Sequence, residues 1–338
     1  MRFEYYHHGL DDQPKLSVDG TVANAIHFSH WSGNETPAEV KADTSTEIAL
    51  NLVASPRRNQ LTQGIQLITN NHFDSDGVLS VWTMLAGEKA LELRDQLIAT
   101  AEAGDFSEFS NEDAVRASIV IQGSDQVSPD DEDGSPLVRQ LRGKAVDEAQ
   151  AYDLVLPQIE RVLTRIDEFE DLWREPWRRI ATAIESFERG TSNVQEYADA
   201  KVSLITLAPE IFSSSGFNPT RHSAPYTAIS RYVRGEIFII ATPMNDGWTY
   251  RIDYPYYSWA ETVVRPRIHR RDLGEFLKHL NEIEGNGDGE WKLDSGEMTS
   301  AAKFLRTDGL LANSTLNPQV VADHLRKLTL PKSTRATV

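Results

Sequence analysis

Short apolar runs alternate with helix-spaced apolar residues along the first part of the chain. The runs at 15–20, 22–28 and 64–69 are typical of buried strands, and polar or turn residues follow each of them. Between the second and third runs, residues 44–47 read Thr-Ser-Thr-Glu. This is a capping box, in which the first threonine hydroxyl and the glutamate side chain satisfy free amides at a helix start. After Gly77 the apolar residues recur at helical spacing, which predicts a second helix.

This alternation predicts an α/β fold with a mainly parallel sheet flanked by helices. We expect one more strand in this region at 117–122, with Asp125 just beyond its end. The polar residues that follow the strands would then line one crevice, because the carboxyl ends of parallel strands meet at one edge of the sheet.

The rest of the chain predicts a long helical region and a smaller C-terminal domain. Residues 144–189 carry a long helix-spaced apolar stripe, and we expect the helix to bend near Pro157. Apolar runs at 236–242 and 248–253 flank an Asn-Asp-Gly sequence, which indicates a hairpin, and a helix is expected at 272–284. A domain of the α/β or α+β class follows from this pattern. The predicted division is an α/β domain at 1–143, a helical connector at 144–196, a C-terminal domain at 197–330 and a tail at 331–338.

Composition narrows the classes of function. The chain has 51 acidic and 34 basic residues and a net charge of −17, which is opposite to the basic face that binds long duplex nucleic acid. It contains no cysteine, which excludes disulfides, cysteine-ligated metals and thiol catalysis. No apolar run approaches the roughly 20 residues of a membrane span, and the N-terminus lacks the pattern of a signal peptide. We expect a soluble, cytoplasmic protein, whose oligomeric state the sequence leaves open.

The residues best suited to chemistry lie between the strand at 64–69 and the helix after it, in the pattern His72-x-Asp74-x-Asp76-Gly77. Two carboxylates and an imidazole offer the oxygen and nitrogen ligands that suit Mn²⁺, Mg²⁺ or Zn²⁺. The helix start after Gly77 also has free amides that favour a phosphate group. The alternative is purely structural, with Asp74 or Asp76 capping the helix.

This segment resembles the first motif of the DHH phosphoesterase superfamily. The resemblance implies a DHH-like domain and Mn²⁺- or Mg²⁺-dependent cleavage of phosphoanhydrides or phosphodiesters. In that family a second strand ends in a metal-bridging aspartate, and a third motif reads Asp-His-His. Residues 16–20 are similar to the second motif, with Asp19 as the bridging carboxylate. Residues 26–37 are similar to the third motif, with His30 at the last position of the triplet.

The order of these motifs differs from the family's order, since the second and third motifs precede the first. The resemblance covers roughly residues 15–125 and implies a circular permutation, which is tolerated where chain ends lie close together at the surface. The triplet keeps only its last histidine, because Phe28 and Ser29 stand where the family has Asp and His. This departure leaves open whether one or two metals bind and whether activity is retained.

Basic residues in the second half are candidates for binding a phosphate-bearing substrate in a C-terminal substrate-binding domain. Arg221 and His222 follow a serine-rich stretch, and Arg265 and Arg267 belong to an arginine-rich run without an acidic residue. Arginine offers a planar fork of donors that matches phosphate. The alternative for these arginines is a solvated surface.

These features favour a divalent-metal-dependent phosphoesterase acting on a small phosphorylated substrate, such as a nucleotide, a short oligonucleotide or a phosphoanhydride. Its cofactor would be Mn²⁺ or Mg²⁺, bound by His72, Asp74, Asp76 and Asp19. Asp74, Asp76 and His30 would carry the catalysis. The second hypothesis is a catalytically inactive DHH-like module that binds a nucleotide or a protein partner.

Overall fold

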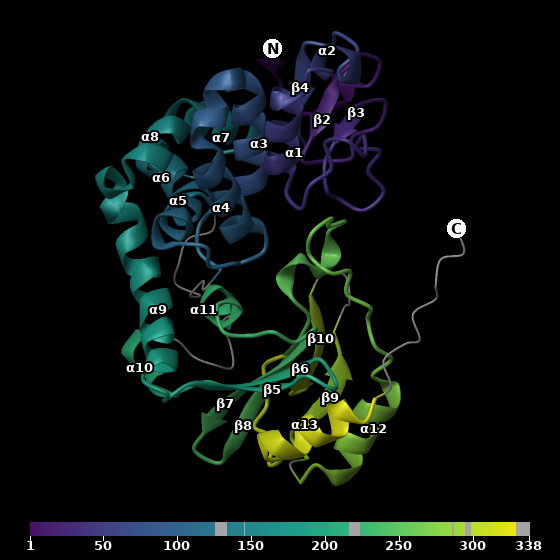
Figure 1. Ribbon diagram of the computed structural model, residues 1–338. Helices are drawn as coiled ribbons and strands as arrows, with labels where there is room; N and C mark the ends of the chain where they lie inside the picture. The colour runs from purple at the N-terminus through teal and green to yellow at the C-terminus, as the bar shows by residue number, and fades with distance from the viewer. Residues whose placement is uncertain (126–133, 145, 216–223, 286, 295–298, 329–338) are drawn as a thin grey trace, which may run out of the picture. The chain divides into compact units, whose positions relative to one another are not determined.

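The computed structural model divides the chain into two units (Figure 1), which are built on different kinds of sheet. The first unit comprises Met1–Arg178 and Trp259–Pro266, and the second comprises Arg179–Ser258 and Arg267–Val338. The structure describes residues 1–338 except 126–133, 145, 216–223, 286, 295–298 and 329–338.

The first unit holds a four-stranded sheet with the strand order β1-β4-β2-β3, in which every neighbouring pair is parallel. The strands are β1 (Arg2–Phe3), β2 (Leu16–Val18), β3 (Ile26–Phe28) and β4 (Leu67–Thr69). Leu16, Val18, Phe28 and Ile68 are fully buried, which explains why these runs are almost continuously apolar. The predicted mainly parallel sheet is confirmed.

Helices pack beside this sheet (Figure 1). α1 contacts β3, and α3 contacts β1, β2 and β4. The helices of the unit are α1 (Ser45–Ala54), α2 (Arg58–Leu61), α3 (Ser75–Ala86), α4 (Arg94–Asp105), α5 (Glu112–Gln122), α6 (Pro136–Arg142), α7 (Glu148–Val155), α8 (Ile159–Thr164) and α9 (Glu170–Glu188), which continues into the second unit. A 3₁₀ turn at Leu156–Gln158 divides the helical region at Pro157, where the sequence predicts a bend. No helix in the described part of the chain is long and apolar enough to span a bilayer.

The strand predicted at 117–122 is wrong, because these residues belong to α5. Asn111 caps α5 by accepting a hydrogen bond from the amide of Ala114 at 2.9 Å. Residues on several sides of the helix are buried, so its apolar run is continuous and resembles that of a buried strand. Asp125 therefore does not end a strand of the sheet.

The start of α1 follows the predicted pattern in part. The Thr44 hydroxyl accepts a hydrogen bond from the Glu47 amide at 3.2 Å, as a capping box requires. The Glu47 side chain does not complete the box, since it pairs with Arg94 at 3.3 Å. The next two amides, of Ser45 and Thr46, are instead bound by a carboxylate of α3, described below.

The second unit contains a six-stranded mixed sheet with the order β5-β6-β7-β8-β10-β9. Its strands are β5 (Asn193–Tyr197), β6 (Val202–Thr206), β7 (Ile237–Met244), β8 (Gly247–Asp253), β9 (Glu290–Leu293) and β10 (Ser300–Leu305). Its helices are α10 (Glu210–Ser215), α11 (Tyr226–Ser230), α12 (Gly274–Ile283) and α13 (Pro318–Arg326). β7 and β8 form the predicted hairpin, and β6 and β7 pair in parallel. The unit is therefore a second sheet-and-helix domain of the expected class.

Candidate metal centre

The ends of β2, β3 and β4 bring polar residues to one edge of the parallel sheet. Asp19 follows β2, His30 lies two residues beyond β3, and His72 lies in the loop between β4 and α3. Because parallel strands end at the same edge, residues distant in the chain converge there.

Asp19 is the central residue of this edge. Its φ of 55° lies in the left-handed region, which is uncommon for a residue other than glycine. Its side chain is fully buried, and its two oxygens accept no hydrogen bond from the described residues but face Nε2 of His30 and of His72 as ion pairs. A buried carboxylate is costly unless an ion pair or a cation compensates it, and backbone strain of this kind clusters at functional sites.

One oxygen of Asp19 belongs to a group that we call the outer group, formed by Asp19, His72 and Asp74. The Nε2 atom of His72 lies 3.0 Å from Oδ2 of Asp19 and 3.2 Å from Oδ2 of Asp74. The side chains of His72 and Asp74 are 25% and 28% exposed, so this group can be reached from solvent.

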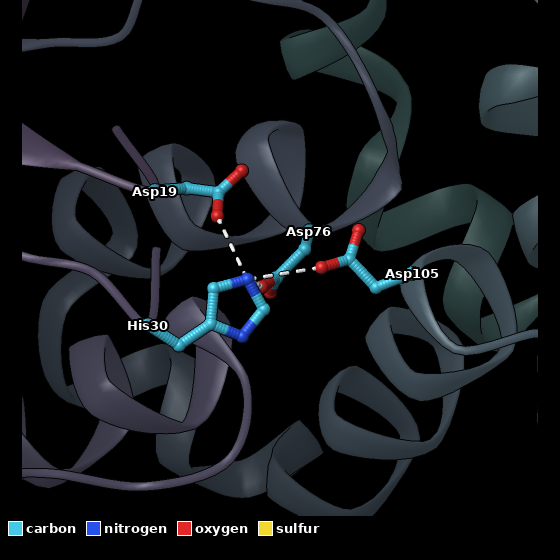
Figure 2. Close-up of side chains that lie close together, drawn as sticks. All are labelled: Asp19, His30, Asp76 and Asp105. Atoms are coloured by element: carbon cyan, nitrogen blue, oxygen red, sulfur yellow. Dashed lines mark ion pairs between the residues drawn. The ribbon is translucent and has the colours of Figure 1, made fainter. Parts of the chain in front are cut away.

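The other oxygen of Asp19 belongs to the inner group, formed by Asp19, His30, Asp76 and Asp105 (Figure 2). The Nε2 atom of His30 lies 3.1 Å from Oδ2 of Asp105, 3.5 Å from Oδ1 of Asp19 and 3.7 Å from Oδ2 of Asp76. Asp76 lies in the first turn of α3, and Asp105 is the last residue of α4. These side chains are almost completely buried.

Two of the aspartates also stabilise helix starts. Asp74 is the N-cap of α3, and its Oδ1 atom accepts a hydrogen bond from the Gly77 amide at 2.7 Å. The Asp76 carboxylate accepts hydrogen bonds from the amides of Ser45 and Thr46, both at 2.7 Å, at the start of α1. The structural role predicted as the alternative is therefore present, since Asp74 caps α3. It does not exclude metal binding, because an ionised carboxylate has about four acceptor sites.

The ring of His30 is oriented as a metal ligand requires. Its Nδ1 atom lies 2.6 Å from the carbonyl oxygen of Asp43, which can only accept a hydrogen bond. Nδ1 therefore carries the proton, and Nε2 faces the carboxylates of the inner group. A histidine ligand is commonly held in this way through its other nitrogen.

Without a cation the centre retains protons. Burial disfavours the charged form of His30, but Asp105, Asp76 and Asp19 outweigh it and raise the pKa of His30 to about 10. Burial likewise opposes protonation of His72, and Asp19 and Asp74 raise its pKa to about 12. Burial and the charge of Asp19 raise the pKa of Asp76 to about 7. Burial raises the pKa of Asp105 well above its usual value, and Asp74 and Asp76 add to this effect.

The donor set fits a hard divalent cation. Both oxygens of Asp19, Nε2 of His30, Nε2 of His72 and Oδ2 of Asp105 are buried without a hydrogen-bond partner in the described structure. These atoms are oxygens and imidazole nitrogens that converge within 4.8 Å in each group. The sharing of Asp19 is compatible with two neighbouring cations, one in each group.

Gly77 is required by the same packing. A Cβ atom at this position would lie 2.5 Å from Nδ2 of Asn70, 2.7 Å from the hydroxyl of Tyr152 and 3.1 Å from Oδ2 of Asp19. The glycine in the His-x-Asp-x-Asp-Gly pattern therefore lets α3 start directly against the centre.

The structure brings together five of the predicted site residues, Asp19, His30, His72, Asp74 and Asp76. It adds Asp105, which the sequence analysis missed because this residue ends a helix and belongs to no local motif. Arg265 lies in the first unit and pairs with three carboxylates, whereas Arg267 is exposed in the second unit. Arg221 and His222 lie outside the described residues.

Comparisons with known proteins place the chain in a family without assigning it an activity. No curated protein matches it. A solved structure titled as a pGpG-specific phosphodiesterase, PggH from Vibrio cholerae, matches with 12% identity and a TM-score of 0.37 over 87% of this chain and 78% of that one. A match at this TM-score is too loose to carry a conclusion about fold or activity. The model of a family of unknown function, DUF6687, matches residues 2–322, and the chain belongs to this family.

Proposed function

We propose that the chain is a divalent-metal-dependent phosphoesterase whose centre holds two cations bridged by Asp19. The observation that carries the proposal is the environment of Asp19, a buried carboxylate that accepts no hydrogen bond and turns one oxygen toward the histidine of each group. A cation in each group would satisfy both oxygens and the two imidazole nitrogens that face them.

The donor atoms favour Mn²⁺ or Mg²⁺ among the divalent cations, since carboxylates outnumber imidazoles in both groups. Such cations lower the pKa of a bound water and neutralise charge that develops on phosphoryl oxygens. His72 and Asp74 are the exposed members of the centre, so a phosphate group would approach from the outer group. The buried His30, Asp76 and Asp105 would hold the inner cation away from bulk solvent.

A small phosphorylated substrate suits the charge of the protein. The net charge of −17 disfavours a long polyanion, so we propose a nucleotide, a short oligonucleotide or a phosphoanhydride. Arg221, His222 and Arg267 stay candidates for binding its anionic groups. The guanidinium of Arg265 is already engaged with Asp43, Glu102 and Glu108.

The competing hypothesis of an inactive binding module was motivated by the two ligands missing from the triplet at residues 28–30. Asp105 weakens this argument, because it brings a carboxylate from the end of α4 to within 3.1 Å of His30. The inner group therefore has three carboxylates and an imidazole, although Phe28 and Ser29 cannot contribute.

Metal titration combined with a substrate panel tests the proposal. Metal-free protein would be titrated with Mn²⁺ by calorimetry and assayed on dinucleotides, phosphodiesters and pyrophosphate. We expect two Mn²⁺ ions per chain and turnover that requires them, and we expect Asp19→Asn to lose both. Asp171→Asn is the matched control, since its side chain is 88% exposed on α9 and makes no contact with the centre. Absence of Mn²⁺ binding would overturn the metal centre, and binding without turnover on any phosphoester would favour the binding module.

A further inference from the structure

The segment at 259–266 packs against the inner group although it lies far from that group in the chain. It belongs to the first unit, whereas the residues on both sides of it belong to the second. The Glu261 amide donates a hydrogen bond to the His30 carbonyl at 2.8 Å. The ring of Trp259 stands edge-on to the ring of His30, with centroids 5.0 Å apart. The segment therefore contacts both the backbone and the side chain of a candidate ligand.

Asp43 is the main attachment point of this segment. Its Oδ1 atom accepts hydrogen bonds from the amides of Val263 at 2.5 Å and Val264 at 2.8 Å. Its Oδ2 atom accepts from the amide of Arg265 at 2.9 Å and from the Arg265 guanidinium at 2.8 Å. Asp43 is thus a buried carboxylate with four donors, which fixes residue 43 firmly.

Fixing residue 43 also fixes the ring of His30. The carbonyl oxygen of Asp43 accepts the Nδ1 hydrogen of His30 at 2.6 Å, as described above. The same residue therefore binds Arg265 through its side chain and orients a candidate ligand through its main chain.

The other edge of the Arg265 guanidinium reaches the turn that carries Asp105. Its Nε and Nη2 atoms donate to the two oxygens of Glu108 at 2.9 and 2.5 Å. Nη2 also donates to Glu102 at 2.7 Å, and the guanidinium lies over the ring of Phe106, 4.9 Å from its centroid. These three contacts flank Asp105 on both sides in the chain.

We propose that Arg265 and Asp43 are positioning residues, which hold His30 and Asp105 at the spacing that the inner cation needs. This inference rests on the proposed function, because it presumes that the inner group binds a cation. The sequence predicts that Arg265 binds substrate, but in this role its planar guanidinium instead links Asp43 to the segment that carries Glu102 and Glu108. Lysine cannot reproduce this bridge, because its ammonium lacks the fixed fork of donors.

The outer group provides an internal reference. The loop that carries His72 is held by other residues, since the Tyr152 hydroxyl donates to the His72 carbonyl at 3.0 Å and accepts from Asn70 at 2.9 Å. A change at Arg265 should therefore weaken the inner cation selectively, whereas a general loss of stability would affect both cations.

The experiment is a Mn²⁺ titration of the full chain, read by calorimetry and by the electron paramagnetic resonance signal of a spin-coupled Mn²⁺ pair. Arg265→Gln should weaken one of the two binding events by about 10- to 100-fold, as loss of a residue supporting a ligand typically does. The other event should stay close to wild type, and the coupled-pair signal should be replaced by that of a single Mn²⁺. Arg265→Lys should show the same selective loss, and Asp43→Asn provides a third variant if Arg265→Gln does not fold. Arg57→Gln is the control, since Arg57 is exposed and pairs with Glu39 away from the centre.

Wild-type affinities for both events in folded Arg265 and Asp43 variants would overturn the positioning role and leave the proposed function intact. Equal weakening of both events would also overturn it, because the effect would then be general. Wild-type protein that binds no Mn²⁺ would overturn the metal centre itself, and the positioning role with it.

Discussion

The Oδ1 atom of Asp19 lies 3.5 Å from Nε2 of His30, and both atoms are buried without a hydrogen-bond partner in the described structure. Neither atom can satisfy the other in an ordinary hydrogen bond at this distance. A cation that binds both would coordinate two buried atoms that take part in no hydrogen bond. This relationship makes the response to metal the most direct test of the centre.

Asp19→Asn should abolish stabilisation by metal. Asparagine tolerates the left-handed backbone of residue 19, so the fold should be retained. The shared carboxylate is lost, and a metal-dependent gain of about 2.7 kcal/mol, expected at a hundredfold excess over Kd, should fall toward zero. Melting curves with and without Mn²⁺ measure this gain. An unchanged melting shift in the variant would contradict the bridging role.

Asp74→Asn and Asp76→Asn should differ in stability although both weaken metal binding. Asparagine caps helices nearly as well as aspartate, so Asp74→Asn should keep the start of α3. The two carboxylate oxygens of Asp76 each accept a hydrogen bond from one backbone amide. Asparagine has only one such oxygen, so its NH₂ group would face the other amide, which is also a donor. We expect Asp76→Asn to cost about 1–3 kcal/mol in metal-free protein. Denaturant unfolding of both variants checks this, and equal stabilities would contradict it.

Mn²⁺ affinity should increase as the pH rises from 6 to 8. A cation must displace protons from His30 and His72, whose pKa values of about 10 and 12 keep them charged at neutral pH. Asp76, with a pKa of about 7, also loses part of its proton on binding. Calorimetry in buffers of different ionisation enthalpy counts the released protons. Binding without proton release would show that the histidines are not ligands.

The stability of metal-free protein should change with pH in the opposite direction. The folded-state pKa of His30 is about 10, above the ordinary histidine value of 6.5, so His30 contributes stability that is complete below about 6.5 and is lost as the pH rises toward 10. His72 acts in the same sense, because its folded-state pKa is also raised. Unfolding free energies measured without metal between pH 6 and 9 should therefore decrease, and a constant or rising value would contradict the assigned charges.

Tyr152→Phe should weaken the outer cation as well as the fold. The buried hydroxyl bridges Asn70 and the His72 carbonyl, and its loss should cost about 1–2 kcal/mol. Tyr250→Phe is a matched control, because it removes a buried hydroxyl that donates to the Leu316 carbonyl in the second unit. Both variants should lose stability, but only Tyr152→Phe should weaken Mn²⁺ binding. A similar effect on metal in both would indicate a general loss of stability.

Local pattern determined the elements that depend on near neighbours in the chain. The strand runs, the Thr44 and Asp74 caps and the β7–β8 hairpin rest on periodicity, capping and turn chemistry, which act within a few residues. The convergence of Asp19, His30 and His72 followed from one further inference, that parallel strands end at one edge.

Only the tertiary structure decided the conformation of residues 117–122 and the partners of Asp105 and Arg265. Residues 117–122 could be a buried strand or a buried helix, and the choice depends on what surrounds them. Asp105 becomes a candidate ligand because α4 ends beside His30, and Arg265 meets Asp43 across 222 residues of chain. The residues next to a carboxylate or guanidinium in the sequence do not indicate such a distant partner. The pairing arises when burial removes water from these groups and leaves other side chains, or a cation, to satisfy them.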